Sequence, residues 1–410
     1  MRGPSVVHAK ARVSAQAVPK SGPMSTSRTT SDKLAEATAP LPASATGAIR
    51  IDLDALAGNW TALAGCVSPA ECGAVVKADA YGLGLARVLP VLTAVGCRTF
   101  FVATPTEAAE ARALSANARI FVLDGLFPGS ADALLAASAI PCLTSLAEVA
   151  EWSAHARRIG VRLASALHVD SGLNRLGMPT DDVKRLAAEP QILEPLDVVL
   201  IMSHLASADD PVDPANATQR VAFEQLRALL PKAQASLAAS DGLMLGSAFH
   251  YDLVRPGYAL YGGQAFRGAR APVQPVVSVH TRVLQVRDVA SGAAVGYSGT
   301  WRATQPSRIA ILAAGYADGF ARTASATNKS PGGSVVIHGT RLPVVGRVSM
   351  DLITVDVTAS PHAVSRGDIA ELLGPALTLE AAGAEAHTIG YEVLTRLGRR
   401  FERHYVGGPA

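Results

Sequence analysis

The sequence has few aromatic residues, few cysteines and no long uninterrupted apolar run. Phe, Trp and Tyr make up 5% of the 410 residues, and the four cysteines show no C-x-x-C spacing. A disulfide framework and a cysteine metal site are therefore poorly supported, and we expect reduced, mostly buried thiols and no bound metal. Because no run of about 18 apolar residues occurs, we expect no membrane-spanning helix.

A strong net charge is also absent from the part of the chain that we expect to fold. Residues 1–50 hold seven Lys and Arg against two acidic residues, and the rest of the chain holds 30 basic and 32 acidic residues. This balance lacks the basic surface that nucleic acid requires, so we expect no nucleic-acid partner. With 49% hydrophobic residues over this length, the chain can bury a large core and form more than one domain.

Residues 1–47 are rich in Ser, Thr, Ala and Pro and show no hydrophobic period. This composition predicts a disordered basic tail. The tail lacks the continuous apolar segment of a secretory signal, and it is similar to a transit peptide only in being basic, Ser-rich and poor in acidic residues. Met24 is an equally good candidate for the start of translation.

Short apolar runs alternate with helical patterns after the tail, beginning at residues 49–54. Such alternation predicts βαβ units and a parallel sheet. Eight strands would close a (β/α)₈ TIM-type barrel over residues 48–271, although seven or nine strands would also fit the pattern. The expected strands are 74–76, 99–103, 120–123, 141–143, 163–169, 198–202, 244–247 and 254–260, and the expected helices between them are 105–114, 131–137, 145–157, 181–188 and 218–235.

The pattern changes after about Gly263. Runs of β-branched residues are then separated by turn residues, and the next helical pattern comes at 391–405. This predicts a second, mostly β domain over residues 272–410, a barrel or a sandwich. Its expected strands are 276–286, 308–313, 334–338, 341–348 and 352–357.

A lysine follows the first expected barrel strand directly. Lys77 comes after the apolar run 74–76, and Gly82 and Gly84 break the chain beyond it. Desolvation at the end of a buried strand lowers the pKa of a lysine and makes its amine nucleophilic enough to form a Schiff base. Taken alone, a lysine whose stem packs at the barrel rim is the more ordinary interpretation.

Polar residues follow several other expected strands, and barrel enzymes carry their chemistry at these C-terminal strand ends. Each such residue has an ordinary structural interpretation when taken singly, as a loop ion pair, a core histidine or a turn cation. Their shared position favours an anionic aromatic cofactor held by a lysine imine, which is pyridoxal phosphate. These residues are His168, Asp170, Arg175, Ser203, His204, Ser240, Ser247 and Arg255.

Eight segments, in order along the chain, form a recognisable pattern. They are Val-Val-Lys77-Ala-Asp-Ala-Tyr81-Gly, Val-Asp-Ser-Gly-Leu-Asn-Arg175-Leu-Gly, Met-Ser-His204-Leu-Ala, Val-Arg255-Pro-Gly-Tyr-Ala-Leu-Tyr-Gly, Val-Gly-Tyr297-Ser-Gly-Thr-Trp, Gly-Tyr316-Ala-Asp-Gly, Val-Gly-Arg-Val-Ser-Met350-Asp351 and Thr-Ile-Gly-Tyr391-Glu. Together they resemble the alanine racemases over about residues 49–405. Eight ordered segments are highly specific, whereas any one of them would be weak.

The resemblance implies a cytoplasmic, homodimeric isomerase that depends on pyridoxal phosphate, with an N-terminal α/β barrel and a C-terminal β domain. It would interconvert L-alanine and D-alanine by a two-base mechanism and supply D-alanine for cell-wall peptidoglycan. Lys77 would bind the cofactor and act as one base, and Tyr297 from the partner subunit would act as the other. Arg175 would serve both cofactor and substrate.

The resemblance also implies roles for the other matching residues. Arg255 would donate to the pyridine nitrogen, Arg175 to the ring phenolate oxygen, and His204 would lie beside the ring. Tyr316 would narrow the access of substrate, and the backbone N–H of Met350 would meet the substrate carboxylate. The expected phosphate-binding residues are Tyr81, Ser240, Gly257, Tyr258 and Tyr391.

Several positions depart from the family's common pattern. Asp79 stands where Asn is usual and Leu83 where His is usual, and both look tolerable. Ala239 stands where Asn is expected, which puts one contact near the phosphate in doubt. His168 occupies the position of a lysine that becomes carbamylated in many relatives and orients the arginine matching Arg175. Because histidine cannot supply a carbamate, we expect another acceptor or an anion to orient Arg175.

Other functions stay open at this point. A broader amino-acid or serine racemase is one alternative, because an apolar pocket rejects an added hydroxyl only weakly. A barrel-type decarboxylase of basic amino acids is disfavoured, since its cysteine-bearing substrate motif is absent from the second domain, and Tyr316 and Tyr391 would restrict the pocket to small side chains. A non-catalytic pyridoxal-phosphate carrier resembles the barrel alone, so the β domain with Tyr297 argues against it.

Overall fold

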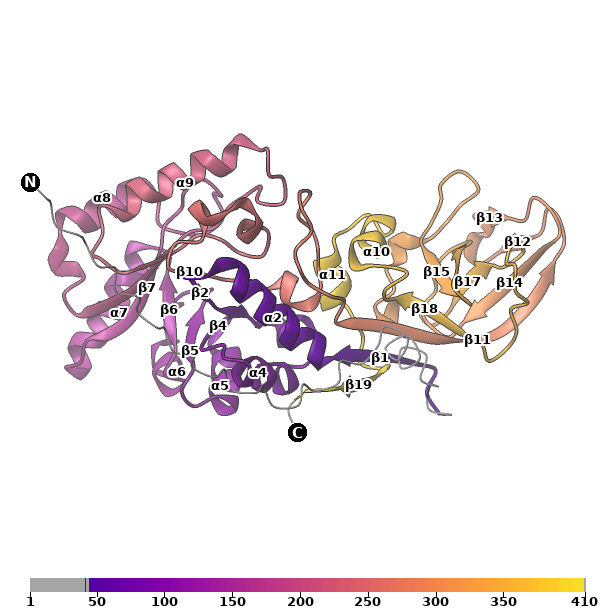
Figure 1. Cartoon of the computed structure of the whole chain (residues 1–410), viewed down its shortest axis with the longest axis horizontal. Coiled ribbons are helices and arrows are strands. Elements are labelled where there is room, and N and C mark those ends of the chain that lie inside the picture. Colours follow the sequence, from indigo (N-terminus) through magenta and orange to yellow (C-terminus); the bar gives the residue numbers. More distant parts are fainter. Residues whose placement is uncertain (1–40, 42–43, 409–410) are drawn as a thin grey trace, which may run out of the picture. The chain divides into compact units, whose positions relative to one another are not determined.

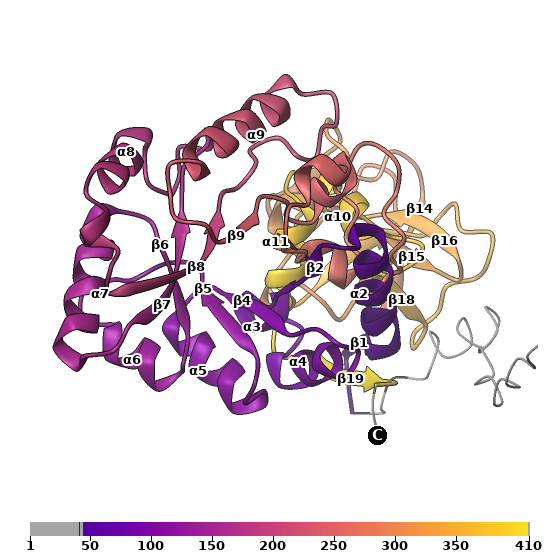
Figure 2. The same ribbon diagram turned by 60° about the vertical axis from the view of Figure 1, so that its left-hand side comes forward.

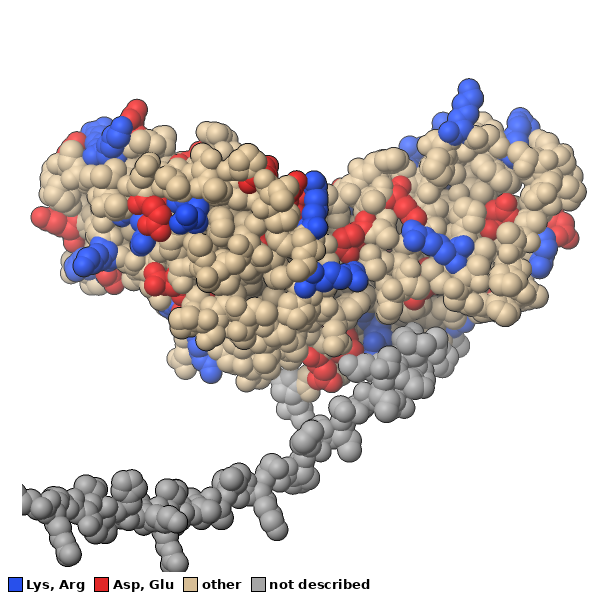
Figure 3. All heavy atoms as spheres, turned by 45° about the horizontal axis from the view of Figure 1, so that its top comes forward, with Lys and Arg blue, Asp and Glu red and all other residues tan. Residues whose placement is uncertain are grey.

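The computed structural model describes residue 41 and residues 44–408. The prediction of a disordered tail over residues 1–47 falls almost entirely outside these residues. Among the described residues, no helix combines the length and the apolar composition needed to cross a membrane. On the face shown in Figure 3, basic and acidic side chains are interspersed rather than gathered by sign.

In the described chain, seven parallel strands form one sheet with neighbours in sequence order, from β3 to β9. A further strand, β10, pairs in parallel with β2, which directly precedes β3. The ring closes because Gly73 N donates to Val254 O (2.9 Å) on one side and Arg255 N donates to Ala238 O (3.0 Å) on the other. The strands are β2 (Glu71–Cys72), β3 (Ala74–Val75), β4 (Thr99–Val102), β5 (Arg119–Val122), β6 (Ile140–Leu143), β7 (Leu163–His168), β8 (Leu196–Met202), β9 (Gln234–Ser236) and β10 (Leu253–Val254).

Counting β2 and β3 as one strand interrupted at Gly73, the described residues form a barrel of eight strands, and its helices lie on the outside (Figure 2). The predicted fold class is confirmed. Local signals set the helix bounds: Thr104 Oγ1 accepts from Glu107 N at the start of α5, and Pro105 occupies its first position. The helices are α2 (Leu53–Val67), α3 (Lys77–Tyr81), α4 (Leu85–Ala94), α5 (Pro105–Leu114), α6 (Ala131–Ala136), α7 (Leu146–Ile159), α8 (Thr180–Ala188) and α9 (Pro214–Arg227).

Two of the strand predictions need correction. Residues 244–247 lie in the short 3₁₀ helices η2 (Asp241–Leu245) and η3 (Ser247–Phe249), and the barrel strand is β9, at the end of the segment predicted as a helix. Helix α9 ends at Arg227 because Pro231 follows and restricts the residue before it. The strand predicted at 254–260 is confined to β10, since Pro256 supplies no amide donor and η4 (Tyr258–Tyr261) begins after it.

The second part of the chain is mostly β, as predicted, with an eight-stranded sheet and a small hairpin among the described residues. The helix predicted at 391–405 ends at Thr395, because the chain continues as a strand that pairs with β1. A further helix, α10, was not predicted. The elements are β1 (Gly47–Asp52), β11 (Val277–Val289), β14 (Ser307–Leu312), β15 (Ser334–Ile337), β16 (Thr340–Pro343), β17 (Ile353–Asp356), β18 (Ile369–Leu373) and β19 (Glu402–Val406), the hairpin β12 (Ala294–Val295) and β13 (Trp301–Arg302), and the helices α10 (Leu379–Glu385) and α11 (Gly390–Thr395).

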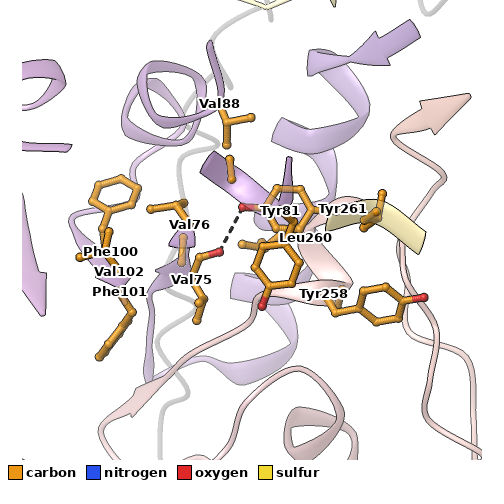
Figure 4. Packing of buried hydrophobic residues seen from close by; sticks show 14 of the residues in the cluster. Val75, Val76, Tyr81, Val88, Phe100, Phe101, Val102, Tyr258, Leu260 and Tyr261 are labelled. Carbon is orange, nitrogen blue, oxygen red and sulfur yellow. Dashed lines mark hydrogen bonds between the residues drawn. The ribbon is translucent and has the colours of Figure 1, made fainter. Parts of the chain in front are cut away.

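Strand β1 precedes the barrel in sequence but belongs to the sheet of the second part (Figure 1). It pairs antiparallel with β11 and parallel with β19. Ile49 and Ile51 of this strand are fully buried in an apolar cluster that also contains Phe101 of the barrel and Phe401. The two parts therefore share one continuous apolar core. Figure 4 shows its portion around β3, where the Tyr261 hydroxyl donates to Val75 O (3.1 Å).

Candidate active site

A cavity of about 850 Å³ lies at the C-terminal ends of the barrel strands, where barrel enzymes carry their chemistry. Lys77 reaches it from the end of β3, His204 from the end of β8, and Arg255 from the end of β10. Helix α11 contributes Tyr391. Eight of the nine expected cofactor-binding residues line this cavity: Lys77, Tyr81, Arg175, His204, Ser240, Arg255, Gly257 and Tyr391.

The chain directly after Lys77 forms a left-handed turn. Ala78, Asp79, Ala80 and Tyr81 have φ of 54°, 54°, 53° and 57°, and Gly82 follows at 83°. For residues with a Cβ this conformation costs roughly 1–2 kcal/mol each, because the Cβ crowds the following carbonyl oxygen. The turn is closed by Ala80 N donating to Val76 O (2.9 Å) and Gly82 N donating to Ala78 O (2.8 Å). The glycines predicted a break here, but the run of four left-handed residues before Gly82 has no sequence signal.

A carboxylate from the neighbouring helix contacts this turn. Glu107 of α5 accepts from Ala78 N through Oε1 (2.7 Å) and from Ala103 N through Oε2 (2.7 Å). At the other end of the turn, Asp79 Oδ1 accepts from Leu85 N (2.6 Å). The Tyr81 ring packs against Tyr261, with ring centroids 4.7 Å apart. Backbone, carboxylate and aromatic contacts thus hold a conformation that the residues themselves disfavour.

Arg255 is a buried cation whose bonding partners are neutral. Its side chain is 2% exposed and donates to Ser236 Oγ (2.6 Å) and to the carbonyl oxygen of Ser203 (2.8 Å). Its Nη2 also lies 3.5 Å from His204 Nδ1. Burial lowers the pKa of Arg255 to about 10, so the guanidinium is still charged at neutral pH. A buried charge of this kind favours an acceptor or an anion in the cavity.

Two histidines at the cavity stay neutral at physiological pH. Burial, reinforced by the Arg255 charge, lowers the pKa of His168 to about 4 and that of His204 to about 3. Within the described structure, the buried His168 Nδ1 has no hydrogen-bond partner. His168 is therefore not bonded to Arg175 through that atom, and our expectation that an acceptor or an anion orients Arg175 stays a prediction. The loop before Arg175 is shaped by Asp170, whose Oδ1 accepts from Gly172 N and Leu173 N (both 2.9 Å).

The expected phosphate-binding residues fall into two groups. Ser240 Oγ accepts from Gly257 N (2.9 Å), and a Cβ at Gly257 would collide with the Tyr81 hydroxyl, so these three residues form one compact wall. Tyr391 also faces the cavity and donates to Asp241 Oδ2 (3.3 Å). Tyr258 lies behind Tyr391, with its ring stacked 3.9 Å away and its hydroxyl donating to Glu380 Oε1 (2.9 Å).

Three of the four site residues predicted in the second domain, Tyr297, Tyr316 and Met350, lie outside this cavity as the described residues form it. Tyr297 begins η5 (Tyr297–Gly299) and is 69% exposed, Met350 is 53% exposed, and Tyr316 begins η6 (Tyr316–Asp318) and is 37% exposed. The loops of Tyr316 and Met350 are joined, since Ala317 N donates to Met350 O (3.1 Å). All three are therefore accessible to another molecule.

Both domains of the chain match known family models. Residues 51–265 match the N-terminal domain of alanine racemase, and residues 276–405 match its C-terminal domain. The chain belongs to the alanine racemase family. The family predicted from the sequence is thus confirmed.

Curated relatives and solved structures agree with this assignment. The chain is 47% identical over 363 residues to the alanine racemase of Methylobacterium nodulans, covering 88% of this chain and 96% of the relative. It is 43% identical over 364 residues to the catabolic alanine racemase of Agrobacterium fabrum, covering 88% and 92%. The crystal structure of the Bartonella henselae alanine racemase with covalently bound pyridoxal phosphate matches with a TM-score of 0.85 and 38% identity, covering 88% of this chain and 100% of that one.

Sequence reasoning missed several residues of this alanine racemase family member that bear on the site. Asp241 lines the cavity directly after Ser240, and burial followed by the charges of Asp209 and Glu380 raises its pKa to about 6. Its position next to Ser240, an expected phosphate-binding residue, is the sequence signal that indicates it. Glu107 was missed as well, because it acts from outside the cavity.

Arg400 is a third missed residue, and it connects the Tyr316 and Met350 loops. Its Nε and Nη2 donate to the two carboxylate oxygens of buried Asp318 (2.8 and 2.6 Å), and its Nη1 donates to Asp351 Oδ1 (2.5 Å). Asp318 ends η6, and Asp351 directly follows Met350. Such a network has no local spacing that a sequence pattern could show.

Proposed function

We propose that this protein is an alanine racemase, a pyridoxal-phosphate-dependent isomerase that interconverts L-alanine and D-alanine. One observation carries the proposal: Lys77 shares a cavity with Arg175, His204 and Arg255 at the active end of a barrel, in a chain that matches the alanine racemase family over both domains. Relatives that bear this name reach 47% identity over most of the chain.

The residues of the cavity fit pyridoxal phosphate, which is the cofactor that we assign to this enzyme. Lys77 supplies a primary amine for its aldehyde, and Arg175 and Arg255 supply cationic donors for its anionic groups. The orphaned Nδ1 of His168 and the neutral bonding partners of Arg255 leave capacity for a ligand. The wall of Ser240 and Gly257 supplies a hydroxyl and a close backbone approach suited to a phosphate.

When bound through a lysine imine, pyridoxal phosphate supplies an electron-withdrawing ring that makes the Cα proton of an amino acid acidic. With its pKa near 10, Arg255 stays protonated and can only donate, so a ring nitrogen held against it would accept a hydrogen bond and carry no proton. The ring is then a weaker electron sink than one facing a carboxylate. Held by Arg255 in this way, the cofactor would favour racemisation over side reactions.

Inverting a stereocentre requires removal of a proton from one face and delivery to the other, so two bases are needed. We assign one role to Lys77 and the other to Tyr297 of a second copy of this chain. The exposure of Tyr297, Met350 and Leu352 (69%, 53% and 40%) supports a homodimer, because large apolar groups exposed at a surface are available to pack against a second copy. Two exposed apolar side chains also line the cavity, Leu176 and Ile389 (40% and 62%).

We further propose that the enzyme works in the cytoplasm and supplies D-alanine for peptidoglycan. Relatives named catabolic alanine racemases also match, at 43% and 44% identity, and they favour a second candidate function in the breakdown of alanine. Deletion of the gene separates the two. A requirement for added D-alanine supports the biosynthetic role, and growth without it on ordinary medium supports the catabolic one.

The decisive test uses the purified full-length protein. Borohydride reduction should fix pyridoxal phosphate onto Lys77, located by peptide mass spectrometry, and L-alanine should lose its optical activity. L-serine and L-lysine tested in parallel measure how strictly alanine is preferred. A fixed cofactor without racemisation would leave a non-catalytic carrier, and a protein that takes no cofactor would exclude both functions.

A further inference from the structure

The left-handed turn after Lys77 cannot be explained by its own residues. Residues visit this region singly, and are then mostly glycine, asparagine or aspartate, whereas here Ala78, Asp79, Ala80 and Tyr81 adopt it in succession. Ala78 and Asp79 are exposed, so tertiary packing of their side chains does not impose the conformation. At these two residues, contacts to the backbone must hold it.

Glu107 provides such a contact at the first residue of the turn. It is the third residue of α5 after the cap Thr104, a position from which glutamate ordinarily reaches back to the start of its own helix. Oε2 accepts such a local hydrogen bond from Ala103 N, whereas Oε1 accepts one from Ala78 N in the turn, and both distances are 2.7 Å. Bonds from amides to an ionised carboxylate are about twice as strong as neutral ones. One side chain thus joins the start of α5 to the residue after Lys77.

We propose that Glu107 is a positioning residue for Lys77. By holding the Ala78 amide in the left-handed turn, it fixes the backbone from which the lysine side chain projects and so sets how readily the amine combines with an aldehyde cofactor. Glu107 is not among the residues that line the cavity, so it acts through the turn and not by touching a ligand. The inference rests on the proposed function only in naming the cofactor.

The first test needs no cofactor. Hydrogen exchange of the full-length chain is followed by mass spectrometry on peptides covering residues 74–85, in the wild type, E107Q and the matched control E110Q, which alters an exposed glutamate on the same helix. Losing the charge and one acceptor should speed exchange in the turn about tenfold in E107Q and leave E110Q at the wild-type rate. Equal exchange in E107Q and the wild type would overturn the proposal.

The second test measures pyridoxal phosphate itself, as the rate and affinity with which the cofactor-free protein takes it up in a form that borohydride fixes on Lys77. We expect the uptake rate and the affinity of E107Q to be about tenfold lower than those of the wild type, and those of E110Q to match the wild type. Faster exchange in E107Q with unchanged cofactor uptake would show that the turn does not control how readily the Lys77 amine combines with the cofactor, and would refute the proposal. A wild-type protein that takes up no cofactor would refute the proposed function, while the exchange experiment would still decide whether Glu107 holds the turn.

A rescue variant separates positioning from general damage to α5. Glycine adopts positive φ without the Cβ penalty, and Ala78 is exposed, so A78G relieves the turn without opening a cavity. The double variant A78G/E107Q should recover a large part of the cofactor uptake that E107Q loses, and A78G alone should match the wild type. If E107Q were merely disrupting the start of α5, a glycine at residue 78 would restore nothing, and that result would contradict the proposal.

Discussion

The burial of Asp241 should make the protein lose stability as the pH rises. Its pKa rises from 3.8 to about 6 because of burial first, then the charges of Asp209 and Glu380, and the bond from Tyr391 only partly offsets this rise. A folded pKa above the unfolded one means that the acid's contribution to stability is complete below pH 3.8 and is lost as the pH rises through about 6. At about pH 8 the ionised group therefore costs at most about 3 kcal/mol, from 1.36 kcal/mol per pKa unit.

Replacing the carboxyl with an amide removes this cost while keeping an acceptor for the Tyr391 hydroxyl. We expect D241N to be more stable than the wild type by about 1–3 kcal/mol at pH 8 and equally stable at about pH 4. Urea unfolding of the cofactor-free protein at a series of pH values measures the difference. D181N is the matched control, because it makes the same change at Asp181 on α8, whose side chain is 95% exposed. A D241N difference that stays constant with pH would show that Asp241 is not an ionised, buried acid.

Three further outcomes follow from the structure. Y297F should impair proton abstraction from one alanine enantiomer far more than from the other, measured by deuterium exchange from each enantiomer, and equal losses would contradict the two-base assignment. R400M should lower the free energy of unfolding by only about 1–3 kcal/mol, because the arginine side chain is half exposed to solvent. It should also raise KM more than it lowers kcat, whereas R399M should change neither stability nor kinetics. Identical kinetics of R400M and R399M would exclude a loop-linking role for Arg400. The lowered pKa of His168 should make the wild type less stable to unfolding as the pH falls from about 6.5 to about 4, and H168N should abolish this loss of stability. If stability depended on pH in the same way in H168N and the wild type, His168 would not be buried as a neutral group.

The barrel was predictable because its signals are local. The pattern 105–114 coincides with α5, and the apolar runs at 74–76, 99–103 and 163–169 contain β3, β4 and β7. The rule that polar residues gather at strand ends then selected cavity residues such as Lys77 and Arg255.

The errors arose where tertiary context decides. An apolar period continuing from 218 to 235 could not show that Pro231 separates a helix from β9, which is held only by pairing with β8. Residues 402–406 form a strand because β1, some 350 positions earlier, pairs with them. Nor can a sequence pattern show that Glu107 bonds a backbone amide 29 residues away. Such contacts depend on the completed fold rather than on nearby residues.

Because β1 belongs to the sheet of the second part of the chain, it cannot pair until much of the chain has been synthesised. On the ribosome this strand is made before the barrel, yet its neighbours β11 and β19 begin 230 and 355 residues later, at Val277 and Glu402. Until then its backbone donors and acceptors stay unpaired and Ile49 and Ile51 lack their packing, a state that invites association between nascent chains. The sheet can close only when the last strand leaves the exit tunnel. We therefore expect chains cut before residue 402 to leave this sheet incomplete and to depend on chaperones.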